Sequence, residues 1–259
     1  MTRIRDAVVL ITGASGGIGE ATALAFAAQH ARLALCARRL DRLNNVAEAC
    51  RRAGAAEVIV RRVDIGRAPD ARTFVAAALQ TFERVDILIN NAGVGWFGAM
   101  DSMPVETMDE IFATNVMGAV HTIQAVLPTL LEQRSGVIIN IASVVGFRPL
   151  PYAAIYSASK HALVALSHAL RGELSGSGVK VSVVYPGTTD TDFFGRDGPE
   201  GRLVQSSQKV AELVLRTARR PRRDVIVAPY RLAQLLEPVA GGLLDHALGE
   251  YRRRHRRPT

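Results

Sequence analysis

Short apolar runs alternate with longer segments of helical periodicity along most of this chain. The runs are rich in Val, Ile, Leu and Ala and are continuous, which is typical of parallel strands buried on both faces. Between them, spacings such as Val75, Leu79 and Phe82 indicate helices. The alternation predicts an α/β fold with a doubly wound parallel sheet, Rossmann-like and in a single domain. We expect strands at residues 7–12, 32–37, 57–63, 86–89, 136–142, 179–185 and 225–227.

No linker divides this domain, which we expect over residues 1–230. It includes a flap at about residues 188–201, where Phe193 and Phe194 precede a stretch rich in glycine. Residues 231–259 are expected to form an amphipathic segment and an arginine-rich tail. Five arginines lie in the last eight residues, and without them the formal net charge falls from +8 to +3. A solvated tail is therefore favoured over a nucleic-acid site or a membrane-surface contact.

A glycine-rich turn joins the first expected strand to the first expected helix. Glycine lets backbone N–H groups approach a pyrophosphate, and the helix N-terminus adds a positive dipole. A glycine cluster alone would also fit an ordinary turn, but the strand before it and the helix after it favour a dinucleotide site. We expect cofactor contacts from Gly13, Ser15, Gly16, Gly17, Ile18 and Gly19.

The end of the second expected strand bears on which dinucleotide binds. NAD-binding proteins usually place an acidic residue there to hold the ribose 2′-hydroxyl, and this chain has Ala37. Arg38 and Arg39 follow and would meet a 2′-phosphate, so NADP(H) is favoured over NAD(H). The alternative is that Arg38, Arg39 and Arg42 only solvate the start of the next helix.

Tyr156 and Lys160 are four residues apart, and Lys160 is one of only three lysines in the chain. On a helix this spacing puts the phenol and the ammonium on one face. An ammonium near the phenol favours phenolate, so we expect Lys160 to lower the pKa of Tyr156. The alternative is an ordinary pair on a solvated face, unless other catalytic groups converge on it.

The order of these motifs resembles that of the short-chain dehydrogenase/reductase family, up to about residue 230. Residues 12–19 match its TGxxxGIG pattern, residues 90–93 match NNAG, and residues 156–160 match YxxxK. The resemblance implies an NADP(H)-dependent oxidoreductase that interconverts a carbonyl and a secondary alcohol by hydride transfer. It also implies cofactor contacts from Asp64, Ile65, Asn91, Ala92, Gly93, Tyr156, Lys160, Pro186, Gly187, Thr188 and Thr191.

The same resemblance assigns the catalytic roles. Ser143 would hydrogen-bond the substrate oxygen, and Tyr156 would exchange the proton. Lys160 would lower the tyrosine pKa and hold the nicotinamide ribose, while Asn115, within an expected long helix, would support a water-linked proton relay. Each residue alone has an ordinary structural explanation, such as a cap or a buried amide. Their joint presence in this order favours catalysis, without a metal ion.

The expected substrate pocket is mainly apolar, which favours a lipophilic ketone or secondary alcohol. Loops that only cover the core would also be apolar, and this fold accepts many substrates. The resemblance places substrate contacts at Ser143, Val145, Tyr152, Phe193 and Phe194. Further expected pocket walls are Trp96, Val144, Phe147 and Leu150.

Composition and chain termini favour a cytoplasmic enzyme. Cys36 and Cys50 are too few for a disulfide framework or a zinc site, and the first apolar run is too short for a signal peptide or a membrane span. The family resemblance implies a homodimer or homotetramer acting on a small molecule. Two alternatives are a non-catalytic NADP(H)-binding scaffold or sensor, and binding of nucleic acid or a membrane surface through the tail.

Overall fold

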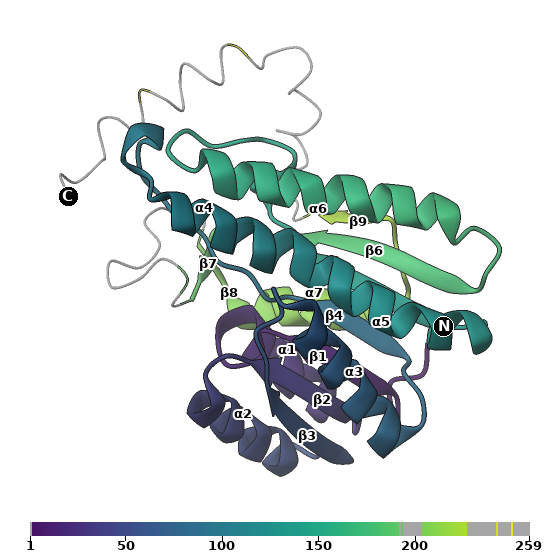
Figure 1. The fold of residues 1–259 in the computed structure, drawn as a ribbon. Coiled ribbons are helices and arrows are strands. Elements are labelled where there is room, and N and C mark those ends of the chain that lie inside the picture. Colours follow the sequence, from purple (N-terminus) through teal and green to yellow (C-terminus); the bar gives the residue numbers. More distant parts are fainter. Residues whose placement is uncertain (1, 192, 194–203, 227–241, 243–249, 251–259) are drawn as a thin grey trace.

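The computed structural model describes residues 2–191, 193, 204–226, 242 and 250. Its main element is a seven-stranded parallel sheet of order β3-β2-β1-β4-β5-β6-β9, flanked by helices on both faces (Figure 1). This confirms the predicted single-domain, doubly wound α/β fold. The expected C-terminal segment, 231–259, lies outside the described residues apart from positions 242 and 250.

All seven expected strands are present, with ends that differ by at most one residue. They are continuous apolar runs because both faces of the sheet are covered by helices. The strands are β1 (Val8–Thr12), β2 (Arg32–Ala37), β3 (Glu57–Arg62), β4 (Ile87–Asn90), β5 (Gly136–Ile141), β6 (Val179–Tyr185) and β9 (Asp224–Ile226). A separate two-stranded pair is formed by β7 (Thr189–Asp190) and β8 (Gln205–Ser206).

The helices divide into two layers, each closing an apolar core. One core packs α1, α2 and α7 on the sheet through residues such as Phe26, Leu43 and Val214. The other packs α3, α5 and α6 on the opposite face through Phe74 and Leu163, among others. The bounds are α1 (Gly17–Ala27), α2 (Leu40–Arg52), α3 (Ala68–Phe82), α4 (Val105–Phe112), α5 (Gly118–Glu132), α6 (Ala154–Glu173) and α7 (Ser207–Arg219).

The segment Val105–Glu132 is continuously helical and passes from α4 through a π-helical turn into α5. Its length and apolar composition would allow it to cross a membrane. In the fold, however, α5 packs against the sheet and α3, with Ile123 and Val126 in the core. A core helix of a globular domain passes the same test, so this segment is weak evidence for a membrane span.

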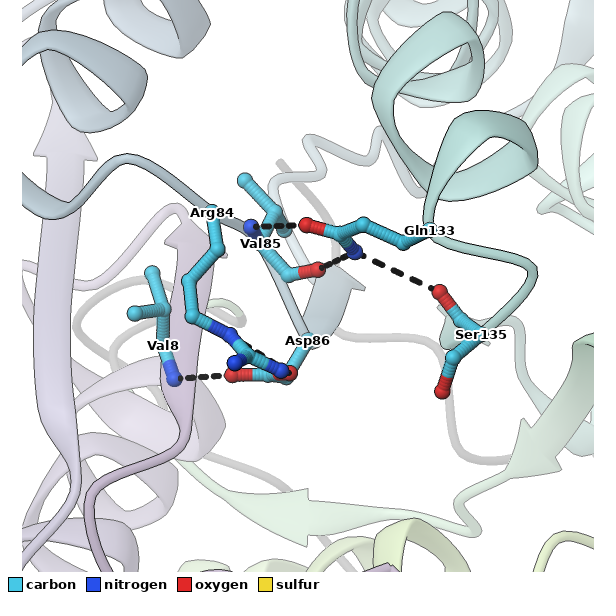
Figure 2. A network of polar contacts seen from close by, with 6 residues as sticks. All are labelled: Val8, Arg84, Val85, Asp86, Gln133 and Ser135. Atoms are coloured by element: carbon cyan, nitrogen blue, oxygen red, sulfur yellow. Dashed lines mark hydrogen bonds and ion pairs between the residues drawn. The ribbon is translucent and has the colours of Figure 1, made fainter.

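Polar side chains connect the N-terminal ends of two central strands to a neighbouring helix (Figure 2). Val8 donates its backbone N–H to Asp86 Oδ2 at 2.8 Å, and Arg84 Nη2 donates to Asp86 Oδ1 at 2.6 Å. Gln133, just after α5, accepts from the Val85 N–H at 3.3 Å and donates to the Val85 carbonyl at 2.7 Å. These contacts tie β1, the start of β4 and the end of α5 together.

A second set of hydrogen-bonded polar side chains lies inside the domain and connects α5 to α6 through two strands. Thr122 donates to Asn90 Oδ1 at 2.7 Å, and Asn90 Nδ2 donates to Asn140 Oδ1 at 2.9 Å. Asn140 in turn donates to Ser167 Oγ at 2.8 Å. All four side chains are buried. Because Asn90 and Asn140 are paired neighbours on β4 and β5, the group fixes the two strand ends that lead into the site.

Candidate active site

The strand order reverses between β1 and β4, so the carboxyl ends of the strands open into a cleft at this point. The cleft has a volume of about 510 Å³ and is lined by segments that follow β1, β2, β4, β5 and β6. The predicted cofactor residues that line it are Gly13, Ser15, Gly16, Gly17, Ile18, Arg38, Arg39, Asp64, Ile65, Asn91, Ala92, Gly93, Tyr156, Lys160, Pro186, Gly187, Thr188 and Thr191. Gly19 is the exception among the predicted set, because it packs beneath the turn against Gly13 and Asn91.

Two glycines shape the turn before α1. Gly13 has φ +67°, and a Cβ there would lie 2.7 Å from the Ala92 Cα. Gly17 has φ +56°, and its added Cβ would lie 2.9 Å from Thr191 Cγ2. Both positions therefore need glycine for conformation and for space. Since α1 begins at Gly17 without a side-chain cap, its first N–H groups are directed at the cleft, which fits the pyrophosphate of a dinucleotide.

Asn91 holds this turn in place from the neighbouring strand. Its Nδ2 donates to the Thr12 carbonyl at 3.0 Å and to the Gly13 carbonyl at 3.2 Å. The backbone N–H groups of Asn91 and Ala92 donate to Thr12 Oγ1 at 3.1 and 3.0 Å. The Asn91 amide donor is thus engaged by the protein itself, and the residue shapes the cleft that it lines.

The adenosine end of the cleft carries both predicted arginines. Ala37 ends β2 and lines the cleft, as do Arg38 and Arg39. Arg39 Nη2 lies 3.4 Å from Ser15 Oγ, over the glycine turn. Arg38 Nη1 donates to Glu110 Oε1 at 2.5 Å. This ion pair was not predicted from the sequence.

Asp64 also lies at this end of the cleft, just after β3. Its Oδ1 accepts from the Gly66 N–H at 3.1 Å, and its own N–H donates to Asp70 Oδ2 at 3.1 Å. These contacts fix the loop between β3 and α3. A carboxylate oxygen accepts more than one hydrogen bond, so Asp64 keeps capacity for a ligand donor.

Ser143 and Tyr156 meet on the other side of the cleft. Ser143 follows β5, accepts from the Val145 N–H at 3.3 Å and lies 3.5 Å from the Pro186 carbonyl. Ser143 and Tyr156, on α6, line the same cleft, and the serine hydroxyl lowers the pKa of the phenol. Desolvation by the surrounding protein raises the pKa of the Tyr156 phenol to about 12, and the interaction with Ser143 only partly offsets this rise. The phenol is therefore protonated at neutral pH.

Lys160 lies one helical turn after Tyr156 and is 4% exposed. Its Nζ donates to the Ile141 carbonyl at 2.9 Å and is 5.9 Å from the centroid of the tyrosine ring. Burial lowers the pKa of Lys160 to about 8. The structure thus differs from the expected lowering of the tyrosine pKa. Lys160 is buried and Tyr156 is partly buried at the cleft, and desolvation disfavours phenolate and ammonium alike.

Asn115 lies in the π-helical turn Ala113–Met117 between α4 and α5. Its Oδ1 accepts from the Val94 N–H at 2.8 Å, and its Nδ2 donates to the Val94 carbonyl and to Ser159 Oγ, both at 2.9 Å. The side chain is 1% exposed and does not line the cleft. Its amide connects the loop segment at Val94 to Ser159 on α6, so it positions groups around Lys160.

Two phenylalanine rings pack around Tyr156. The Phe193 ring centroid is 5.3 Å from that of Tyr156, and the Phe97 centroid is 5.8 Å from Tyr156 and 6.1 Å from Phe193. Phe193 was predicted, whereas Phe97 was missed. Its place in the apolar run after the NNAG motif was the available signal, but the adjacent Trp96 was predicted instead.

The other predicted substrate residues divide into two groups. Val145 lines the cleft, together with the expected walls Val144 and Leu150. Tyr152, Trp96 and Phe147 do not line it, and Phe194 lies outside the described residues. The physical reason is local packing: the Tyr152 carbonyl accepts from the Gly98 N–H, the Trp96 ring contacts Gly98, and Phe147 packs on Tyr185.

Comparison with known proteins identifies the protein family to which this chain belongs. The family model for short chain dehydrogenases matches residues 7–200, which include the glycine turn, Ser143, Tyr156 and Lys160. The chain belongs to the short-chain dehydrogenase/reductase family. An uncharacterized oxidoreductase of Staphylococcus aureus (strain MW2) is 36% identical over 221 residues, covering 85% of this chain and 94% of the relative. A Staphylococcus epidermidis oxidoreductase is also 36% identical, over 222 residues, with coverage of 85% and 94%.

Solved structures of other short-chain dehydrogenases have the same fold. A Burkholderia phymatum member in complex with NAD superposes with a TM-score of 0.85 at 29% identity, covering 94% of this chain and 97% of that one. An alcohol dehydrogenase from the archaeon Thermococcus sibiricus, complexed with 5-hydroxy-NADP, gives a TM-score of 0.78 at 31% identity, with coverage of 85% and 95%. The chain is therefore an oxidoreductase of a family whose members bind NAD or NADP.

Proposed function

We propose that this short-chain dehydrogenase uses NADP(H) to interconvert a carbonyl and a secondary alcohol, with Tyr156 as the proton donor and acceptor. The observation that carries the proposal is that Ser143 and Tyr156 line one end of a cleft whose other end is formed by the glycine turn. A bound nicotinamide would supply or accept the hydride. The residues of this chain would then bind and orient the cofactor and the substrate, and would move a proton.

Proton transfer is best supported in the direction of carbonyl reduction. With a pKa of about 12, Tyr156 holds its proton at neutral pH and is ready to give it to a developing alkoxide. Ser143 would donate to the same oxygen and stabilise its charge. Lys160, whose ammonium lies beneath the tyrosine ring, would favour the phenolate left after transfer.

NADP(H) is supported by two features of the adenosine end. Ala37 supplies no carboxylate for a 2′-hydroxyl, and two guanidinium groups line the cleft beside it, Arg38 and Arg39. A guanidinium binds phosphate through paired hydrogen bonds. Arg38→Asp should therefore weaken NADPH binding far more than NADH binding, and equal weakening of both would contradict the proposed cofactor.

A lipophilic substrate is supported by the side chains around Tyr156. Phe97 and Phe193 contact its ring, and Val145 and Leu150 line the same part of the cleft. Such walls desolvate an apolar ligand and leave Ser143 and Tyr156 to orient its oxygen.

The deciding experiment is a panel of ketones and secondary alcohols of graded hydrophobicity, followed by NADPH absorbance. Tyr156→Phe should keep NADPH binding and lose nearly all turnover, because only the proton donor is removed. Undiminished turnover would rule out Tyr156 as the donor. Turnover confined to small polar carbonyls would rule out the lipophilic substrate.

We further propose that the enzyme is a cytoplasmic homodimer or homotetramer. The support is an apolar surface along α4, the π-helical turn and α5, where Val105, Phe112, Met117 and Leu131 are 64%, 37%, 43% and 41% exposed. A second copy would cover these side chains. Light scattering should give a multiple of 27.9 kDa for the parent and a smaller species for Phe112→Arg. A monomeric parent would contradict this assembly.

A further inference from the structure

The ion pair between Arg38 and Glu110 brings together two parts of the chain that are 72 residues apart. Arg38 follows β2 at the adenosine end of the cleft, and Glu110 belongs to α4. The two side chains are 53% and 47% exposed. An exposed pair of this kind is weak and exchanges partners readily, because water solvates both charges when it opens.

Helix packing fixes Glu110 beside the adenosine pocket. The next residue, Ile111, is fully buried and anchors α4 to the domain. Two residues after Ile111, Ala113 packs on Gly66, where an added Cβ would lie 3.3 Å from the alanine. Gly66 belongs to the loop of Asp64, which lines the cleft. The carboxylate is therefore held at the cleft edge by buried contacts of its own helix.

Arg39 is placed differently, although it is adjacent in sequence. Its guanidinium lies over the glycine turn, 3.4 Å from Ser15 Oγ. A 2′-phosphate arriving between the two arginines would meet Arg39 on the cleft side and Arg38 already bound to a carboxylate. Two anions would then share one guanidinium, at a distance where like charges repel.

We propose that Glu110 is a specificity-determining residue that competes with the 2′-phosphate of NADP(H) for Arg38. This inference rests on the proposed NADP(H)-dependent function and refines it. Glu110 reduces the difference in affinity by which NADP(H) binds more tightly than NAD(H). The 2′-phosphate of NADP(H) must displace the carboxylate from Arg38 and then remains near its negative charge. A ribose 2′-hydroxyl, being neutral, leaves the pair intact.

The test measures dissociation constants of NADPH and NADH for the full-length protein by calorimetry at low and high salt. Glu110→Gln should tighten NADPH binding by about three- to tenfold at low salt, with a smaller gain at high salt and less than a twofold change for NADH. Asp109→Asn is the matched control: it removes the same charge from the adjacent exposed position, and it should change NADPH binding less than Glu110→Gln does. In an Arg38→Gln background, the effect of Glu110→Gln should shrink towards that of Asp109→Asn.

Three results would overturn the inference. They are weaker or unchanged NADPH binding in Glu110→Gln, an equal gain for NADH, and an undiminished gain in the Arg38→Gln background. Each can be told apart from failure of the proposed function, because the parent would still bind NADPH in all three. A parent that binds neither dinucleotide would remove the proposed function, and this inference with it.

Discussion

Replacing Lys160 with methionine should stabilise the protein at neutral pH while lowering turnover. Burial lowers the pKa of Lys160 from 10.5 to about 8, so the folded state disfavours the ammonium by about 3 kcal/mol at pH 7. Methionine has a similar volume and no charge to desolvate. It leaves the Ile141 carbonyl without the 2.9 Å bond from Lys160, which costs about 1 kcal/mol. The expected net gain in the free energy of unfolding is about 2 kcal/mol.

The pH dependence of this gain has a definite sign. Below pH 8 the lysine is charged in both the folded and the unfolded parent, and the full penalty is present. Between pH 8 and 10.5 the folded protein has lost the proton while the unfolded chain keeps it, so the penalty shrinks as the pH rises. At pH 9.5 it falls to about 1 kcal/mol, which the lost hydrogen bond cancels. The gain should therefore vanish near that pH.

Urea unfolding of the parent and Lys160→Met at pH 7 and pH 9.5 measures both quantities. Lys209→Met, an exposed lysine on α7, is the control and should change stability little at either pH. If Lys160→Met is no more stable than the parent at pH 7, the desolvation penalty is refuted. A gain that is equal at both pH values would show that it comes from packing and not from the charge.

Three further changes test the cleft and its support. Gly13→Ala should abolish dinucleotide binding and lower the free energy of unfolding by about 2 kcal/mol or more, since φ is +67° and the Cβ would meet the Ala92 backbone. Calorimetry measures the binding, and urea unfolding measures the stability. Asp86→Ala should lower the free energy of unfolding by about 1–3 kcal/mol in urea unfolding, by leaving the Val8 N–H without its acceptor, and an unchanged midpoint would contradict the role given to that contact. Phe97→Ala should raise KM for lipophilic substrates in steady-state assays with little effect on NADPH binding, and equal effects on both would place Phe97 in the cofactor site.

The strands and the glycine turn could be predicted because their signals are local. Buried parallel strands have continuous apolar runs, and the turn at Gly13 needs a residue that accepts positive φ without a side chain. The predicted catalytic serine, tyrosine and lysine also meet in the cleft, since strand ends and helix faces follow from the same pattern.

Other features depend on contacts between distant segments, which local patterns do not carry. The pairing of Arg38 with Glu110 requires knowing that α4 packs beside the end of β2. The raised pKa of Tyr156 reflects desolvation by neighbouring segments of the fold. Trp96 and Phe97 are adjacent aromatic residues, and only the fold decides which of them contacts the tyrosine ring.

The buried hydrogen bonds from Thr122 through Asn90 and Asn140 to Ser167 have a consequence for folding. They cross β4 and β5 at one level, so a slip of either strand by one residue would break the bond between the two asparagines and bury unpaired amides. Each unpaired polar group costs about 1–3 kcal/mol, whereas the surrounding Val, Ile and Leu side chains would tolerate many alignments. The apolar residues make the sheet collapse, and these four polar residues select one alignment of its central strands.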